Sequence, residues 1–134
     1  MIFGIGTDIA YIPRFERWFA KQGQRAISSV LTPLESVEFN QRYDRNVTRG
    51  IAFFASRFAA KEAFSKACGL GMTTPMNWQS VQVMSLATGQ PQIHLLGNMA
   101  VWFNDRQLIA HLSLSDEREY AIAYVVLSHS FKEK

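Results

Sequence analysis

Three charged residues carry the chemistry that this sequence could perform. Asp8 follows the apolar run 2–5, and Glu62 and Lys66 are one helical turn apart in the segment 48–68. Two carboxylates that approach each other repel unless a cation lies between them. A site with only two carboxylates suits Mg²⁺, which fills its coordination sphere with water and phosphate oxygens. Asp8 and Glu62 are therefore candidate magnesium ligands, with Lys66 nearby.

Glu62 is the residue that fits its surroundings least. Apolar residues in the segment 48–68 recur at the spacing of an amphipathic helix, and Glu62 falls inside their stripe, with Arg57 and Lys61 to one side of it. Three explanations are open. The helix ends there and leaves Glu62 at the rim of the core, or Glu62 pairs with a buried Arg or Lys, or it meets a cation in a cleft, because an unpaired buried carboxylate is costly.

Lys66 and the glycines after the helix have ordinary interpretations as well. Lys66 lies four residues after Glu62, the spacing of a surface ion pair, and Gly69 and Gly71 match a helix stop. Beside a two-carboxylate metal site, a lysine and a glycine-rich turn could instead hold phosphates. Gly4-Ile5-Gly6 is not a dinucleotide fingerprint, because position 9 is not glycine.

The rest of the sequence predicts an α+β scaffold for these residues. Helical patterns come first and alternating patterns follow, an order typical of α+β folds. We expect a single domain, 1–134, in which a long central helix packs on an antiparallel sheet. The expected elements are a strand from residue 2 that ends in a polar turn at Gly6-Thr7-Asp8, helices over 13–23, from 33 to about 41 or beyond, and over 48–68, a hairpin over 81–95, a short helix over 97–104, and strands over 112–115 and 120–127.

Composition narrows the class of protein. The chain has 134 residues, of which 48% are hydrophobic, the range of one globular domain. No apolar run approaches the length that spans a bilayer, and the start lacks the basic residues of a secretory signal. Cys68 is the single cysteine, which excludes an internal disulfide and a cysteine cluster for zinc. We expect a cytoplasmic protein without a membrane partner.

Basic residues gather in one short stretch of the chain. Arg14, Arg17, Lys21 and Arg25 fall together with one acid, Glu16, although the net charge is only +3. A solvated helix face is one interpretation, and a docking surface for nucleic acid or an acidic protein is the other. We expect no nucleic-acid partner, because the net charge is modest and no groove-reading or base-stacking motif is present.

Three segments resemble those of one known family. Ile5-Gly6-Thr7-Asp8-Ile9 is similar to its opening strand motif, and the run from Arg57 to Ala67 (RFAAKEAFSKA) is similar to its central helix signature. The run from His111 to Ser115, followed by Tyr120-Ala121-Ile122-Ala123, resembles its closing strand pair. The chain therefore resembles the holo-[acyl-carrier-protein] synthases, the short type of 4′-phosphopantetheinyl transferase.

The resemblance implies an enzyme that uses Mg²⁺ and coenzyme A. Asp8 and Glu62 would hold Mg²⁺ against the pyrophosphate of coenzyme A, and Lys66 would stabilise the leaving phosphate. A serine of an apo acyl carrier protein would attack the β-phosphate and release 3′,5′-ADP. Either Glu62 or a water on the metal would accept the serine proton. The fold would assemble as a homotrimer with active sites at the subunit interfaces.

The resemblance also assigns binding residues around this centre. Arg57 and Lys66 match positions near the coenzyme A phosphates, where Gly69 and Gly71 form the glycine turn, and His111 matches one at the nucleotide pocket. Arg14 matches a contact to the carrier protein, and the charge pattern extends that docking surface to Arg17, Lys21 and Arg25.

Two features depart from the family pattern, and two other functions stay open. Leu70 stands where many members have threonine, and Asp116 stands where many have a second histidine. The first alternative function is that of a relative that binds carrier protein or coenzyme A without catalysis. The second is a nucleic-acid-binding module that uses the basic stretch.

Overall fold

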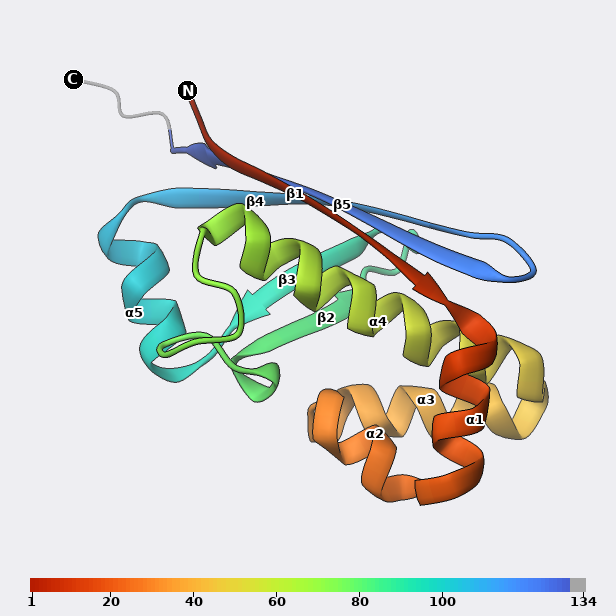
Figure 1. The fold of residues 1–134 in the computed structure, drawn as a ribbon. Helices are drawn as coiled ribbons and strands as arrows, with labels where there is room; N and C mark the ends of the chain where they lie inside the picture. Colours follow the sequence, from red (N-terminus) through yellow and green to blue (C-terminus); the bar gives the residue numbers. More distant parts are fainter. Residues whose placement is uncertain (131–134) are drawn as a thin grey trace.

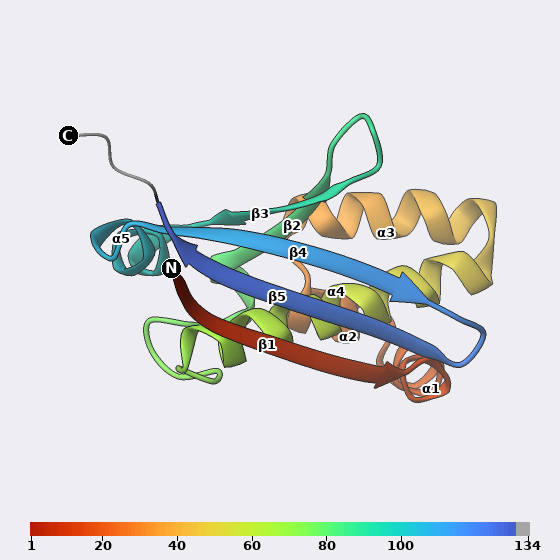
Figure 2. The ribbon, with the colours of Figure 1, turned by 90° about the horizontal axis from the view of Figure 1, so that it is seen from above.

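The computed structural model describes residues 1–130 and confirms the α+β class. One layer is an antiparallel sheet in the order β1–β5–β4, formed by β1 (Ile2–Tyr11), β4 (Leu108–Asp116) and β5 (Tyr120–His129). The long helix α4 (Val47–Cys68) lies under this sheet, as Figures 1 and 2 show. Seen from above, the opposite face of the sheet has no helix from residues 1–130 lying over it (Figure 2).

The remaining elements surround α4 on its other sides. The helices α1 (Ile12–Gln22), α2 (Gln24–Val30) and α3 (Pro33–Arg45) form one end of the molecule (Figure 1). A short 3₁₀ helix, η1 (Trp78–Ser80), leads into the hairpin of β2 (Val81–Ser85) and β3 (Pro91–Leu95), and α5 (Gly97–Asp105) follows. The helix α2 was not predicted, because it is short and no side chain caps its start.

Local signals set the ends of the two best-predicted helices. At the start of α3 the Thr32 hydroxyl accepts from the Glu35 N–H, and the Glu35 carboxylate accepts from the Thr32 N–H at 2.8 Å, which is the predicted capping box. At the end of α4, Gly69 adopts φ 77° and its N–H donates to the Lys66 carbonyl. Only glycine takes this left-handed conformation without strain, which explains the stop.

The strand β1 is longer than predicted, and this corrects the position of Asp8. The strand runs on to Tyr11, so Asp8 lies within it, opposite Ala123 of β5, and not in a turn after it. Asp8 occupies one of the alternating β1 positions that face α4, and its side chain is only partly buried there. A polar residue can therefore continue the strand at this position, which is why the turn prediction failed. A Cβ on Gly6, on the same face, would overlap the carbonyl oxygen of Ala63. Glycine therefore lets β1 and α4 approach closely enough for Asp8 to meet residues of α4.

The helix α4 is not amphipathic, which corrects the helical-wheel prediction. Of its 22 residues, 16 are buried, because the sheet covers one side and α1, α3 and β2 cover others. Glu62 is only half-buried, whereas Lys61 is fully buried. The Lys61 ammonium donates to Glu35 Oε1 at 2.7 Å and to the backbone carbonyls of Val30 and Trp78 at 2.7 and 2.9 Å. Lys61, not Glu62, is therefore fully buried, and its ammonium is fully paired.

The strand β5 is central, as predicted, but only one of its faces is buried. Its buried residues alternate with the exposed Ile122 and Tyr124, which retain 45% and 44% of their accessible surface. Neighbouring strands add exposed isoleucines to the same side. We call this surface the outer sheet face, and it comprises Ile5, Ile9, Ile109, Ile122 and Tyr124.

Candidate active site

The structure brings Asp8 and Lys66 into direct contact, with Glu62 close by. The Lys66 ammonium lies 3.2 Å from Asp8 Oδ1 and donates to the Thr7 carbonyl at 3.0 Å. Asp8 and Lys66 line a hollow of about 260 Å³ at the free edge of β1. The ion pair between Lys66 and Glu62, one of the two interpretations of Lys66, does not form, because Lys66 reaches across to β1 instead.

The electrostatics of Glu62 show that the two carboxylates are near enough to repel. Burial raises the pKa of Glu62, and the negative charge of Asp8 raises it further, while Lys66 and Arg14 act in the opposite direction. The helix α4 continues past Glu62 to Cys68. Within residues 1–130, Glu62 forms no salt bridge with Arg or Lys. The helix therefore does not end at Glu62, and a cation beside this half-buried carboxylate stays a prediction.

Asp8 and Glu62 fit a divalent cation that takes most of its ligands from water and phosphate and only two from the protein. No group of three or more His, Cys, Asp or Glu side chains among residues 1–130 could hold a metal by itself. Two carboxylates that repel each other suit Mg²⁺, which completes its octahedron with water and phosphate oxygens. A cation between Asp8 and Glu62 would relieve the repulsion that raises the pKa of Glu62.

The glycines after α4 have a structural role in this molecule. The Gly69 N–H donates to the Lys66 carbonyl at 3.0 Å, and the Gly71 N–H donates to the Ser65 carbonyl at 3.3 Å. Both glycines have positive φ angles, 77° and 61°. Their N–H groups thus cap the carbonyl end of α4, and a contact of Gly69 and Gly71 with phosphates stays a prediction.

Arg57 lies in a different hollow from Asp8 and Lys66. Its side chain is 5% exposed, its Nη2 donates to Ser85 Oγ at 3.2 Å, and its guanidinium stacks 4.3 Å from the Phe53 ring. Burial lowers the pKa of Arg57 to about 10. Its buried Nε has no hydrogen-bond partner among residues 1–130. An orphaned donor on a buried cation is a feature that an anion would satisfy.

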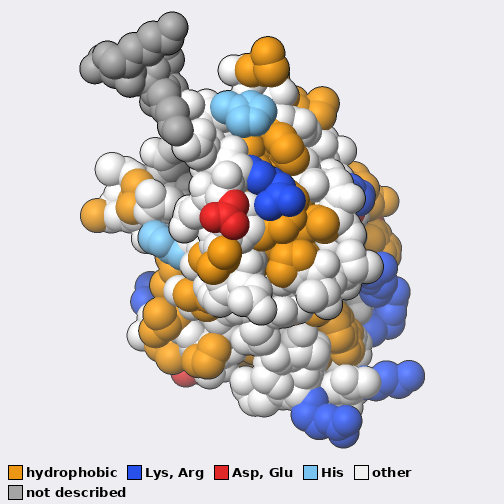
Figure 3. Space-filling view, turned by 90° about the vertical axis from the view of Figure 1, so that its left-hand side faces the viewer, with side chains coloured by type: hydrophobic (Ala, Val, Ile, Leu, Met, Phe, Trp, Pro, Cys, Tyr) orange, Lys and Arg blue, Asp and Glu red, His pale blue; other side chains and the backbone are white. Residues whose placement is uncertain are grey.

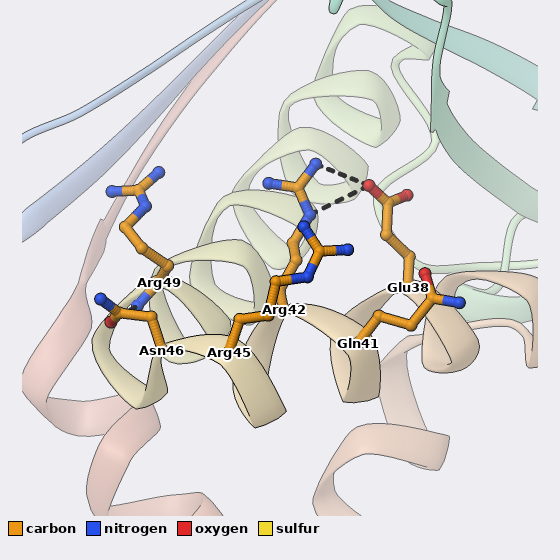
Figure 4. Close-up of a pocket in the computed structure, with 6 residues that line it drawn as sticks. All are labelled: Glu38, Gln41, Arg42, Arg45, Asn46 and Arg49. Atoms are coloured by element: carbon orange, nitrogen blue, oxygen red, sulfur yellow. Dashed lines mark hydrogen bonds and ion pairs between the residues drawn. The ribbon is translucent and has the colours of Figure 1, made fainter.

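Further arginines border this hollow, and the sequence reasoning missed them. The hollow measures about 230 Å³ and includes Arg42, Arg49 and Asp116. Arg42 and Arg49 also line an adjoining hollow of about 390 Å³ with Arg45, and Figure 4 shows the three arginines projecting from the end of α3 and the start of α4. Arg42 is paired with Glu38 at 2.6 Å, and Arg49 with Asp116 at 3.0 Å. The three- and four-residue spacing of these arginines was a signal, but it crosses a helix junction.

His111 is separated from the Asp8 cluster within one chain. It is exposed on β4, opposite Val126, and its Nε2 lies 3.0 Å from Ser128 Oγ. The strand β5 lies between β4 and β1. Its role at a nucleotide pocket therefore stays a prediction, and that role would require either a ligand that spans the sheet or a second copy of the chain.

The four basic residues of α1 and α2 are exposed or close to the surface. Arg14, Arg17, Lys21 and Arg25 are all solvent-accessible, and Figure 3 shows Lys and Arg side chains along the lower, helical end of the molecule. The Arg14 guanidinium lies 4.9 Å from the Phe15 ring centre and 5.5 Å from that of Phe58. Arg14 also lowers the pKa of Glu62, so this basic surface borders the carboxylate site.

Comparisons with known proteins agree on one family. Residues 4–125 match the family model of the 4′-phosphopantetheinyl transferase superfamily. The chain is 48% identical over 127 residues to a holo-[acyl-carrier-protein] synthase of Leptothrix cholodnii, covering 95% of this chain and 96% of that protein. The crystal structure of such a synthase from Neisseria meningitidis is similar with a TM-score of 0.86 and 35% identity, over 96% of this chain and 99% of that one.

A second solved structure was determined with a ligand. It is a holo-(acyl-carrier-protein) synthase from Bacillus anthracis in complex with CoA (3′,5′-ADP), similar to this chain with a TM-score of 0.79 and 34% identity. The match covers 97% of this chain and 99% of that chain. No helix within residues 1–130 has the length and apolar character needed to cross a membrane.

Proposed function

The chain belongs to the 4′-phosphopantetheinyl transferase superfamily, and we propose that it transfers the 4′-phosphopantetheine arm of coenzyme A to a serine of an apo acyl carrier protein. The products are holo carrier protein and adenosine 3′,5′-bisphosphate. The observation that carries this proposal is the meeting of Asp8, Glu62 and Lys66 where β1 approaches α4.

Asp8 and Glu62 are the residues that would hold Mg²⁺. The raised pKa of Glu62 supports this assignment, because burial and, after it, the charge of Asp8 disfavour the ionised carboxylate, and a cation would offset both. When bound, the ion would neutralise charge on the diphosphate of coenzyme A and align it for attack. The protein supplies the two carboxylates on elements that Gly6 keeps in close contact.

The side chains of this site can carry the remaining steps. The serine oxygen forms a bond to the β-phosphorus, and the bond from that phosphorus to the bridging oxygen of the α-phosphate breaks. The leaving oxygen gains negative charge, which the Lys66 ammonium is placed to stabilise. Either Glu62 or a water molecule at the cation site would accept the serine proton.

The hollow at Arg57 is the proposed site for a phosphate of the nucleotide part. Arg57 is buried and has an unpartnered Nε among the described residues, whereas Arg42 and Arg49 are each offset by a carboxylate. An anion bound there would be recognised mainly by Arg57, with Arg42 and Arg49 at the rim.

The outer sheet face supports a homotrimer. Its five exposed apolar side chains lie on adjacent strands, and an apolar patch of this kind typically marks a protein interface. His111 lies on this side of β4, so assembly would bring it toward the hollows of a neighbouring copy. Light scattering should give a mass of three times the 15.2 kDa chain, and Ile122→Glu should lower it; a monomeric wild type would contradict the trimer.

The basic surface of Arg14, Arg17, Lys21 and Arg25 is proposed to dock the acidic carrier protein. Opposite charge accelerates such an encounter, and the position of Arg14 near Glu62 would bring the carrier serine to the carboxylate site. Acyl carrier protein and coenzyme A, the two proposed substrates, are found in the cytoplasm, and we propose that this protein is cytoplasmic as well.

Mass spectrometry of the carrier tests the proposed function. Apo carrier proteins of fatty-acid synthesis and of secondary pathways are incubated with coenzyme A, Mg²⁺ and the protein. We expect one of them to gain the mass of the phosphopantetheine arm. Glu62→Gln should abolish the gain, and Arg106→Gln, a charge change on the remote end of α5, should retain it. Absence of any gain would favour a non-catalytic binding protein, and salt-dependent binding to DNA or RNA alone would favour the nucleic-acid module.

A further inference from the structure

The Asp8 carboxylate already has a cationic partner, which is Lys66. The Lys66 ammonium contacts Asp8 Oδ1 at 3.2 Å and the Thr7 carbonyl at 3.0 Å. Asp8 has 17% of its side chain exposed, and Lys66 has 51%. A divalent cation on Asp8 would have to share this carboxylate with the ammonium or displace it.

The charges around Asp8 and Glu62 are close to balanced without a divalent cation. The two carboxylates carry two negative charges, while Lys66 contacts Asp8 and Arg14 acts on Glu62 from α1. The other charged side chains of α4 face elsewhere, Lys61 toward Glu35, Arg57 toward Ser85 and Arg49 toward Asp116. A cation that arrives alone therefore meets a site that is already neutralised, and it is repelled by the Lys66 ammonium.

A cation that arrives with a diphosphate meets a different balance. The diphosphate brings oxygen acceptors for the Lys66 ammonium, so breaking its contact with Asp8 leaves no unpaired charge. The displacement itself is easy, because an exposed lysine pair is weak and its chain is flexible. The Thr7 carbonyl that loses its donor lies at the free edge of β1, where water can replace it.

Resting on the proposed function, we propose that Lys66 is a competitor of the divalent cation for Asp8 and changes partner during each cycle. Lys66 holds Asp8 until the cation and the diphosphate of coenzyme A bind together, and then it passes to the diphosphate. Cation and coenzyme A therefore raise each other's affinity, since such coupling is reciprocal. The free protein should bind a divalent cation weakly.

Cation binding to the protein alone tests this exchange. Mn²⁺ replaces Mg²⁺ as the probe, because it prefers similar oxygen ligands and free Mn²⁺ is measured by electron paramagnetic resonance. Without coenzyme A, Lys66→Gln should lower the Mn²⁺ dissociation constant about tenfold, the size of losing one nearby positive charge in a solvent-exposed setting. The same variant should lose transfer activity, so that binding and turnover change in opposite directions.

Two control variants separate a local effect from a general one. Lys66→Arg keeps the positive charge and should leave Mn²⁺ affinity within about twofold of wild type, as should Arg106→Gln, which removes a charge at α5. Adding Asp8→Asn to Lys66→Gln should remove the gain. Circular dichroism checks that each variant is folded.

The outcomes for the two proposals differ. Mn²⁺ affinity that is unchanged or weaker in Lys66→Gln would overturn the exchange, even if the wild type transfers the arm. Tighter Mn²⁺ binding in Lys66→Gln, with no transfer by the wild type to any carrier, would keep the competition between Lys66 and the cation for Asp8 but reject the transferase assignment.

Discussion

The loss of folding stability that the structure predicts most directly is the one caused by replacing Lys61 with methionine. Lys61 and Glu35 are both fully buried, and their ion pair is 2.7 Å long. In Lys61→Met the Glu35 carboxylate keeps the backbone N–H groups of Thr32 and Val83, at 2.8 and 2.6 Å, but loses its only ion-pair partner among the described residues. Breaking a buried pair in this way costs about 3–5 kcal/mol.

The expected cost can be converted into a melting temperature. An unfolding entropy of about 2.1 cal/mol/K per residue gives about 0.28 kcal/mol/K for the whole chain, which has 134 residues. The melting temperature should therefore fall by about 11–18 °C. Calorimetry at one fixed protein concentration measures this fall, because association also shifts the transition.

Two further variants decide whether the loss comes from the uncompensated charge. Glu35→Gln combined with Lys61→Met removes both charges and should be less destabilised than Lys61→Met alone. Arg42→Met breaks the half-exposed pair with Glu38 and should cost at most about 1 kcal/mol. A cost of about 1 kcal/mol or less for Lys61→Met, equal to that of the surface pair, would refute the reasoning.

Three other changes have defined outcomes. Glu62→Gln should abolish transfer yet raise the melting temperature, measured at pH 7 with a chelator present. The folded-state pKa of Glu62 is raised above its ordinary value of 4.5, so ionisation of the wild-type carboxyl lowers stability as pH rises through the folded-state pKa. Equal melting temperatures at pH 7, or a difference that persists below pH 4.5, would contradict this. Gly6→Ala should lower the melting temperature by several degrees in calorimetry, since its Cβ overlaps the Ala63 carbonyl, and a neutral result would show that β1 is free to shift. Arg14→Glu should mainly raise the Michaelis constant for carrier protein in steady-state kinetics; an effect limited to coenzyme A would reject the docking role.

Much of the fold was predictable because its signals are local. Thr32 and Glu35 form the predicted capping box, and Gly69 ends α4 where the sequence indicated. The hairpin over β2 and β3 followed from alternation on both sides of a glycine and proline turn. Such features depend on a few neighbouring residues, which the sequence displays directly.

Other features depend on long-range packing and were predicted incorrectly. The wheel assumed one buried face for α4, but several elements surround this helix, so Lys61 and Arg57 are buried and Glu62 is not. Asp8 resembled a turn residue, yet its place on the inner positions of β1 keeps the strand continuous. The hollow that Arg42, Arg49 and Arg57 share is formed by segments far apart in sequence.

The sequence predicted which residues form the candidate site better than it predicted how they are arranged. Asp8, Glu62 and Lys66 do lie together, but the lysine pairs with Asp8 across the strand and not with Glu62 along the helix. Arg57 and His111 lie apart from this group within a single chain. The proposed completion of the site by a second copy of the chain would account for that separation, and one sequence contains no direct signal of such sharing.

A crystal structure of the protein with coenzyme A and Mn²⁺ tests the account most directly, because anomalous scattering locates the metal. We predict one strong anomalous peak between the carboxylates of Asp8 and Glu62, with the diphosphate of coenzyme A beside it. A metal bound elsewhere, or coenzyme A seated with no peak between these two carboxylates, would contradict the account.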